Sequence, residues 1–270
     1  MEIKAVMHLG RFKDIVVTLF RYGFDDVVER LDLPGKVIFE KIRKVDREMS
    51  TWERIRHMLV DLGPTYIKFG QIMSLRPDLI PRPLILELRK LQDEVAPVKY
   101  QEIQEVVEKN LRRPISEVFS FFDEEPLAAA SLAQVHRAIL RENKEVVAVK
   151  VQRPRIRQVI EPDLYILGRI AGQLHERMEW GKTYDLPKLV QEIRKTLLRE
   201  LDFTREARHM KICRNNFSEM EEVYIPRLYD DYCSEHVLTM ELVQGIKMKD
   251  LGPGHDLDRE LLVVGAVLRK

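Results

Sequence analysis

Apolar residues recur at intervals of three and four over most of the first 120 residues, which predicts a largely helical region. The clearest helix is expected over residues 12–31, where Pro34 and Gly35 follow it. Ser50, followed three residues later by Glu53, predicts a capped helix start. Further helices are expected over residues 65–76, 84–95, 100–112 and 115–122.

The pattern changes after residue 123, where short apolar runs bounded by polar turns predict β-strands. The runs 134–140 and 146–151 are joined by a polar turn and predict an antiparallel hairpin. This order of elements predicts an α+β chain, in which helices precede a small sheet with inserted helices. The later elements are expected as helices over 155–178 and 186–212, strands over 222–225 and 237–243, and a last helix from Leu257.

Composition narrows the class of protein. The 270 residues include 45 lysines and arginines against 44 aspartates and glutamates, and this balance argues against a nucleic-acid binder. Two cysteines are too few for a disulfide framework, and the seven histidines form no metal-binding pair, so we expect no metal site. The low cysteine count favours a reducing environment, so we expect a cytoplasmic protein. No apolar run is long enough for a membrane span, and we recognise no signal peptide.

A run of small residues precedes the predicted hairpin, and Lys150 follows it in the sequence V-A-V-K. Protein kinases have a comparable pattern of three loop glycines, a valine, and a strand lysine that touches the phosphates. Small residues let backbone N–H groups approach phosphate oxygens, and alanine makes such a loop stiffer than glycine does. An alanine-rich turn packed against a helix would explain the same run without a ligand. The run consists of Ala128, Ala129, Ala130, Ser131, Ala133 and Val135, with Ala128, Ala130 and Ala133 at the glycine positions.

Three carboxylates lie on a later predicted helix, and a kinase-type lysine needs one such partner. Asp202 and Glu206 are four residues apart and would share a helix face. Glu200 would lie about 120° from Glu206, so one straight helix cannot direct both to one point. We therefore expect two separate tasks, in which one carboxylate pairs with Lys150 and another meets a different cation. A solvated charged face is the alternative.

Two further motifs are weaker on their own. Lys68 and Gln71 would project from one face of a short helix, and Gly70 between them predicts a close approach of another segment. A surface lysine and glutamine beside a packing glycine is the alternative. The strand predicted over 237–243 ends in a polar loop, and such an edge can offer backbone groups to an adenine ring. The candidate residues there are Met240, Glu241 and Val243.

In this order, the motifs closely resemble those of the UbiB/AarF family of atypical protein-kinase-like proteins, which is associated with coenzyme Q. The resemblance runs from about residue 50 to the end of the chain. Its elements are K-x-G-Q at residues 68–71, the alanine-rich loop at 128–131, V-A-V-K ending at Lys150, E-x-D at 200–202, and the lysine-pairing Glu206.

The resemblance implies a kinase-like small lobe that binds ATP or ADP, with Mg²⁺ in the full-length protein. A helical extension would precede the lobe, and its K-x-G-Q helix would regulate the site with Glu200 and Asp202. The resemblance also implies a link to ubiquinone biosynthesis or lipid homeostasis. The expected ranges are 1–122 for the extension, 123–245 for the lobe and 246–270 for the start of a C-terminal lobe.

Phosphoryl transfer in kinase-like folds needs a catalytic-loop Asp, an Asn, and the metal-binding Asp of a D-F-G motif. The sequence contains no D-F-G and no such catalytic loop. We therefore expect this chain to be the front part of a longer ATPase or phosphotransferase, inactive by itself. The competing interpretation is a non-catalytic interaction module. It would bind a lipid-biosynthesis protein or the inner-membrane surface through its N-terminal helices, with residues 11–31 as the candidate.

Overall fold

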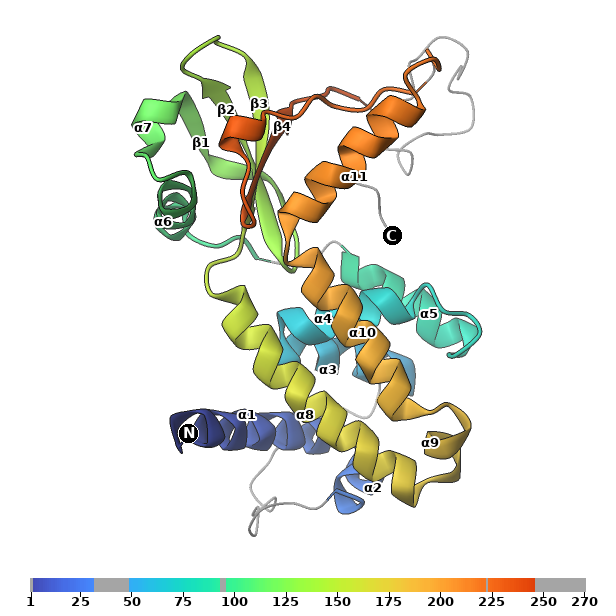
Figure 1. Ribbon diagram of the computed structural model, residues 1–270. Helices are drawn as coiled ribbons and strands as arrows, with labels where there is room; N and C mark the ends of the chain where they lie inside the picture. Colours follow the sequence, from blue (N-terminus) through green and yellow to red (C-terminus); the bar gives the residue numbers. More distant parts are fainter. Residues whose placement is uncertain (1, 32–48, 93–95, 222, 246–270) are drawn as a thin grey trace. The chain divides into compact units, whose positions relative to one another are not determined.

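The computed structural model describes residues 2–31, 49–92, 96–221 and 223–245 (Figure 1). These residues form two compact units. We call the unit from residues 1–95 and 155–198 the helical unit, and the unit from residues 96–154 and from 199 onward the sheet unit. The α+β class, with a largely helical N-terminal region and a small antiparallel sheet, is confirmed. The helix expected from Leu257 and the range 246–270 lie outside the described residues.

The helical unit follows most of the predicted helices. Gly23, with a φ of 77°, divides the helix expected over residues 12–31 into two. The predicted cap is confirmed, because Ser50 and Glu53 form a reciprocal capping box. The helices are α1 Glu2–Arg21, α2 Asp25–Glu29, α3 Thr51–Leu62, α4 Pro64–Met73, α5 Arg82–Arg89, the 3₁₀ turn η1 Lys90–Gln92, α8 Ile156–Arg177, α9 Glu179–Thr183 and α10 Leu186–Glu200.

The apolar side of α1 is buried within the helical unit. Val16 is fully buried and packs in a cluster with Val28, Leu31 and Leu174. Arg11, on the same helix, forms an ion pair with Asp163 of α8 (Nε–Oδ1 2.6 Å). The apolar residues of this segment are therefore occupied by contacts inside the chain. None of the helices in the described ranges is both long and apolar enough to cross a membrane.

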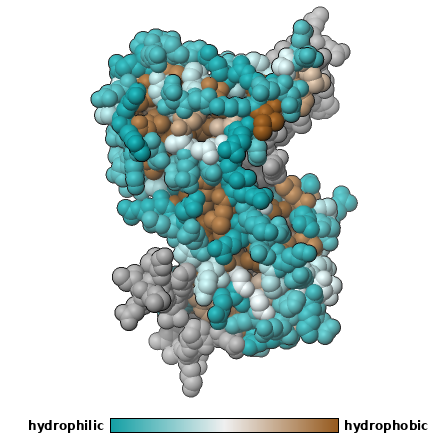
Figure 2. Space-filling model, viewed as in Figure 1, coloured by the Kyte–Doolittle hydropathy of each residue, from teal (hydrophilic) through white to brown (hydrophobic). Residues whose placement is uncertain are grey.

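The sheet unit contains four antiparallel strands in the order β1-β2-β3-β4. On the face of the molecule drawn in Figure 2, hydrophobic residues are exposed only in patches between hydrophilic residues. The strands are β1 Phe119–Ala129, β2 Ala133–Leu140, β3 Val146–Gln152 and β4 Val237–Glu241. The helices of this unit are α6 Tyr100–Leu111, α7 Ile115–Val118, α11 Phe203–Asn216 and the 3₁₀ turn η2 Asp230–Tyr232.

Two predicted elements of this unit are wrong. The helix expected over 115–122 ends at Val118, and the chain continues as β1. Irregular register along β1, with shifts on both sides of Phe122, removes the alternating pattern by which a strand is recognised. The strand expected over 222–225 is not formed by its described residues 223–225, and Leu228 makes only an isolated bridge to Met240 of β4.

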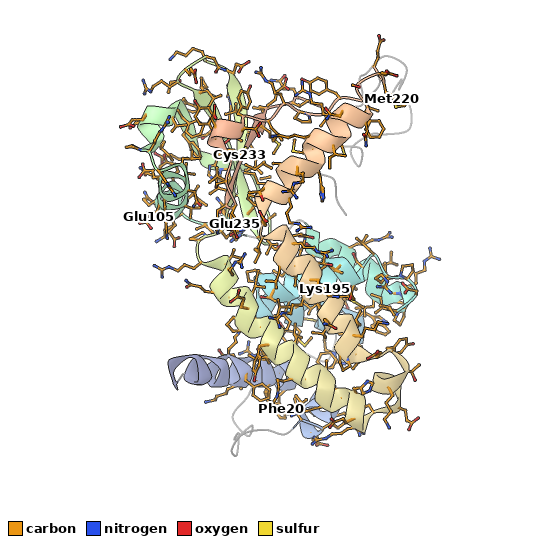
Figure 3. The ribbon with its side chains drawn as sticks, viewed as in Figure 1. Phe20, Glu105, Lys195, Met220, Cys233 and Glu235 are labelled. Atoms are coloured by element: carbon orange, nitrogen blue, oxygen red, sulfur yellow. The ribbon has the colours of Figure 1, made fainter. Side chains whose placement is uncertain are left out.

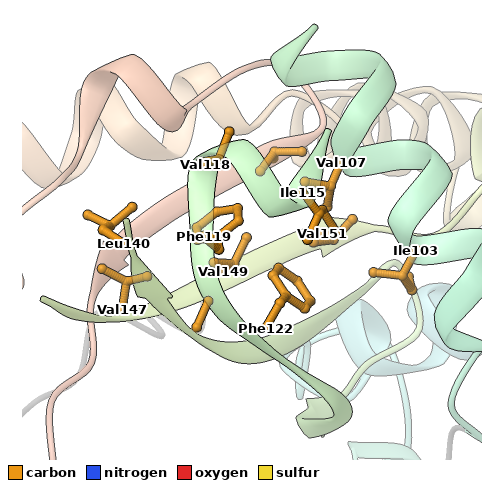
Figure 4. Packing of buried hydrophobic residues seen from close by; sticks show 12 residues of the cluster. Ile103, Val107, Ile115, Val118, Phe119, Phe122, Leu140, Val147, Val149 and Val151 are labelled. Carbon is orange, nitrogen blue, oxygen red and sulfur yellow. The ribbon is translucent and has the colours of Figure 1, made fainter. Parts of the chain in front are cut away.

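Each face of the sheet packs against a different helix. Val149 and Val151 of β3 face α6, in a cluster with its buried residues Ile103 and Val107 (Figure 4). The opposite face packs against α11, where Leu238 of β4 lies in a second cluster. Successive strand residues point to opposite faces, so the even-numbered residues of β3 lie on the α11 face.

Candidate functional site

Lys150 and Glu206 form an ion pair on the α11 face of the sheet. The Nζ atom of Lys150 lies 2.6 Å and 2.8 Å from the two carboxylate oxygens of Glu206, although the residues are 56 positions apart. Both side chains remain partly exposed, at 26% and 29%. The lysine also lies over the ring of Phe203, with Nζ 4.8 Å from the ring centroid. The structure thus holds an oriented, accessible cation at the centre of the sheet.

The helix expected over residues 186–212 is broken, so the one-helix argument for the three carboxylates is wrong. Glu200 ends α10, and Asp202 is the N-cap of α11, where its side chain accepts a hydrogen bond from Thr204 N–H (3.0 Å). Asp202 and Glu206 therefore do not share a continuous helix face. Glu235, labelled in Figure 3, fixes the start of α11, because its carbonyl accepts a hydrogen bond from Phe203 N–H (3.0 Å).

Five of the ten predicted nucleotide-binding residues share the α11 face. Val135 and Leu238 are the cross-strand partners of Lys150, so all three point to this face. The register places Ala128 and Met240 on it too, through their pairs with Val135 and Ala148. Ala133 lies in the α11 cluster. These side chains form a surface of small and apolar residues around one lysine.

The alanine-rich loop is the tight turn between β1 and β2. Ala130 N–H donates to Ala133 C=O at 2.8 Å and closes the turn. The two residues at its tip, Ser131 and Leu132, are 3% and 6% exposed. In the described part of the chain, neither of their backbone N–H groups donates to another protein atom. Unpaired N–H groups on buried residues are rare, so these two donors distinguish the turn from the rest of the sheet.

Glu241 is placed differently from the other candidates. It ends β4 and pairs with Val147, so it points to the opposite face from Lys150. Its carboxylate accepts hydrogen bonds from the Tyr224 hydroxyl (2.6 Å) and the Arg227 N–H (3.1 Å). Ala129, paired with Gln134, also lies on that other face. Their side chains are therefore not part of the surface around Lys150, and Val243 follows beyond the strand.

The K-x-G-Q motif lies on α4 in the helical unit. Gln71 donates its side-chain N–H to the Leu91 carbonyl (2.9 Å), so it ties α4 to the turn after α5. A Cβ at Gly70 would lie 2.5 Å from Leu91 Cδ1 and 2.9 Å from Leu59 Cδ1. The glycine therefore allows α4 to pack closely against its neighbours. Lys68 belongs to this unit, whereas Glu200 and Asp202 belong to the sheet unit, and a joint regulatory role stays a prediction.

Replacing Gly70 with alanine is expected to destabilise the helical unit by about 1–3 kcal/mol, the usual cost of overpacking a core. In an open helix the same change would stabilise, because alanine is the better helix former. Gly168 of α8 is the matched control, since a Cβ there meets nothing within 4 Å. Urea unfolding of both variants measures the difference, and equal effects of the two changes would contradict the packing role of Gly70.

The antiparallel sheet, the helix on one face and the strand lysine paired to a helix glutamate define a small lobe of the protein-kinase-like class. The comparisons agree, since residues 90–264 match the ABC1 atypical kinase-like domain. The chain therefore belongs to the ABC1 atypical kinase-like family, and it is similar in sequence to UbiB proteins.

Curated relatives extend the match beyond the domain. The chain is 38% identical over 249 residues to a "probable protein kinase UbiB" of Pectobacterium carotovorum, covering 90% of this chain and 46% of the relative. It is 40% identical over 261 residues to the protein of the same description in Pseudomonas fluorescens, covering 93% and 48%. The chain thus spans about half the length of these relatives.

A solved structure has a related fold. The chain resembles the Mycobacterium tuberculosis protein Rv3197, solved in complex with erythromycin, with a TM-score of 0.50 and 27% identity. The similarity covers 71% of this chain and 48% of that structure. It agrees with the kinase-like fold class.

The structure adds one residue that the sequence analysis missed. Arg153, three positions after Lys150, donates its Nε–H to the carbonyl of Ala130 in the alanine-rich turn (2.8 Å). The run Gln152-Arg153-Pro154 has no periodicity or spacing that relates it to the turn. Only the pairing of β2 with β3 brings the two segments together.

Proposed function

We propose that the sheet unit binds ADP or ATP on the α11 face, as part of an atypical kinase-like ATPase or phosphotransferase. The Lys150–Glu206 ion pair, at 2.6 Å, is the observation that carries this proposal. A lysine held by a helix carboxylate, on the strand after a small-residue turn, is the phosphate-binding arrangement of kinase-like folds.

The residues present suit a nucleotide. Bound ADP or ATP would supply a row of anionic phosphate oxygens, which need hydrogen-bond donors and positive charge. Lys150 would offer the charge, and the N–H groups of Ser131 and Leu132, which have no acceptor among the described residues, would offer donors at the turn. Met240 and Val135 would offer apolar surface to the base. The backbone of residues 241–243 would offer hydrogen-bonding groups to the polar edge of the base. Glu206 would hold the lysine in position without touching the nucleotide.

Mg²⁺ would accompany the nucleotide in the full-length protein. Within the described residues, no three histidine, cysteine, aspartate or glutamate side chains are grouped to hold a metal ion. We therefore propose that the metal ligands come from other parts of the protein. Lys68, Gly70, Gln71, Glu200 and Asp202 are proposed as regulatory residues on the strength of the family motif alone.

Titration of the 270-residue chain with ADP and ATP in a calorimeter tests the proposal directly. We expect saturable binding of both nucleotides and no turnover of ATP. If neither ADP nor ATP bound at millimolar concentration, the proposed site would be overturned.

We propose further that the whole protein acts in ubiquinone biosynthesis or lipid homeostasis. This proposal rests on the names of the UbiB relatives and on the family resemblance. Deleting the gene should lower the cellular quinone content or change the lipid composition. Restoration of both by a Lys150→Ala protein would argue against a nucleotide-dependent role.

The alternative function, binding to a membrane or partner through the N-terminal helices, is less well supported. In the candidate segment 11–31, Ile15 and Val16 are 2% and 0% exposed, and Arg11 is paired with Asp163. An amphipathic surface helix needs its apolar side free for the partner. Here that side already packs within the helical unit.

A further inference from the structure

Arg153 is held at the base of the alanine-rich turn by three hydrogen bonds to backbone carbonyls. Its Nε–H donates to Ala130 C=O (2.8 Å), and an Nη2–H donates to Ala96 C=O (2.7 Å). Its backbone N–H donates to Leu132 C=O (2.9 Å). The guanidinium thus joins the turn to the segment that leads into α6. This segment is not part of the hairpin.

No carboxylate among the described residues balances the charge of Arg153. Among the described residues it forms no ion pair, and its hydrogen-bond partners are all neutral carbonyls. Burial without a counter-ion lowers the pKa of this guanidinium. Keeping an uncompensated cation half-buried costs free energy, so its position beside the predicted phosphate loop calls for a functional explanation.

The direction of the Arg153 side chain determines how the turn presents its N–H groups. Val149 and Val151 face α6, and Arg153 continues this alternating series one residue beyond β3. It therefore draws the Ala130 carbonyl toward the face opposite Lys150. In a trans peptide the C=O and N–H bonds point in opposite directions, so the Ser131 N–H is turned away from Arg153. That direction leads toward the Lys150 face.

We propose that Arg153 is a positioning residue for nucleotide phosphate, because its guanidinium fixes the Ala130–Ser131 peptide with the N–H directed toward the Lys150 face. The proposal rests on the proposed function of the sheet unit. The arginine also polarises the peptide it binds, and hydrogen bonds in series strengthen one another, so the Ser131 N–H becomes a better donor to an anion. Alanine residues make the turn stiff, and Arg153 selects which way the stiff turn faces.

Arg153→Ala and Arg153→Lys test the proposal. Lysine keeps the positive charge but cannot reproduce the planar fork that reaches two carbonyls at once. We expect ADP to bind about tenfold or more weakly to both variants, the factor carried by one hydrogen bond to a charged group. Adenosine, which has no phosphate, should bind as it does to the unchanged chain. Arg141→Ala and Arg141→Lys are the matched controls. The Nε–H of Arg141 also donates to a backbone carbonyl, that of Ser116 (2.8 Å), but at the other end of β2.

Hydrogen exchange without nucleotide separates this inference from the proposed function. The Ala130 amide, bonded to Ala133 C=O, should exchange at least tenfold faster in Arg153→Ala than in Arg141→Ala. If the unchanged chain does not bind ADP, the proposed function fails and the exchange rates still decide whether Arg153 fixes the turn. Unchanged exchange in Arg153→Ala, or full ADP affinity in Arg153→Lys, would overturn the role of the guanidinium fork. If Arg153→Ala weakened the binding of ADP and of adenosine equally, Arg153 would have a general structural role instead.

Discussion

Replacing Lys150 with alanine is expected to abolish binding of ADP and ATP to this chain. The change removes the cation and also leaves the Glu206 carboxylate, 2.6 Å from the former Nζ position, facing the phosphates. Attraction is thereby replaced by repulsion at the same place. We expect affinity to fall by a factor of about 100 or more, on the scale of losing one preorganised phosphate contact. Isothermal titration calorimetry with ADP measures the loss.

The chain offers a matched control for this lysine. Lys211 pairs with Asp230 at 2.7 Å, but both side chains are exposed to more than 50%. Lys211→Ala removes the same charge from α11 and should leave nucleotide affinity nearly unchanged, because exposed charges are screened. Glu206→Gln should weaken binding less than Lys150→Ala, since the cation remains and only its orientation is relaxed. Undiminished binding in Lys150→Ala would refute the assigned site.

Replacing Asp163 with alanine is expected to destabilise the helical unit by about 3–5 kcal/mol, as when one partner of a buried ion pair is removed. Asp163 is fully buried, and its two oxygens accept hydrogen bonds from Arg11 Nε–H (2.6 Å) and Nη2–H (3.0 Å). Arg11 also donates to the Leu62 carbonyl and lies over the Tyr66 ring. Without the carboxylate, a partly buried guanidinium at the junction of α1, α4 and α8 has lost its counter-ion.

Tryptophan fluorescence during urea unfolding measures this effect selectively. Both tryptophans, Trp52 and Trp180, belong to the residues of the helical unit. Asp78→Ala is the control, because the Arg76–Asp78 pair has a similar two-bond geometry but is exposed to solvent. We expect almost no change there, since exposed ion pairs contribute little. Similar unfolding midpoints for Asp163→Ala and Asp78→Ala would contradict a stabilising role for the buried pair.

The candidate site was predictable where local residue type decides the outcome. Residue type and order predict the V-A-V-K strand and the small-residue turn, and the family resemblance predicts Glu206 as the partner of the lysine. Two conclusions about geometry were wrong because they assumed regular elements. The break at Leu201–Asp202 makes Asp202 a helix cap, and the irregular register of β1 conceals its strand character.

The sequence by itself determined the α+β class, the helical N-terminal region and the family, because hydrophobic periodicity and motif order are local properties. Only the tertiary structure decided that the region 96–122 packs with the sheet and that α8 packs with α1. It alone brought Arg153 to the Ala130 carbonyl and Arg11 to Asp163, which are 23 and 152 positions apart. Such contacts depend on strand register and on the packing of helices that are far apart in the sequence. Hydrophobic periodicity, which is a local property, does not predict them.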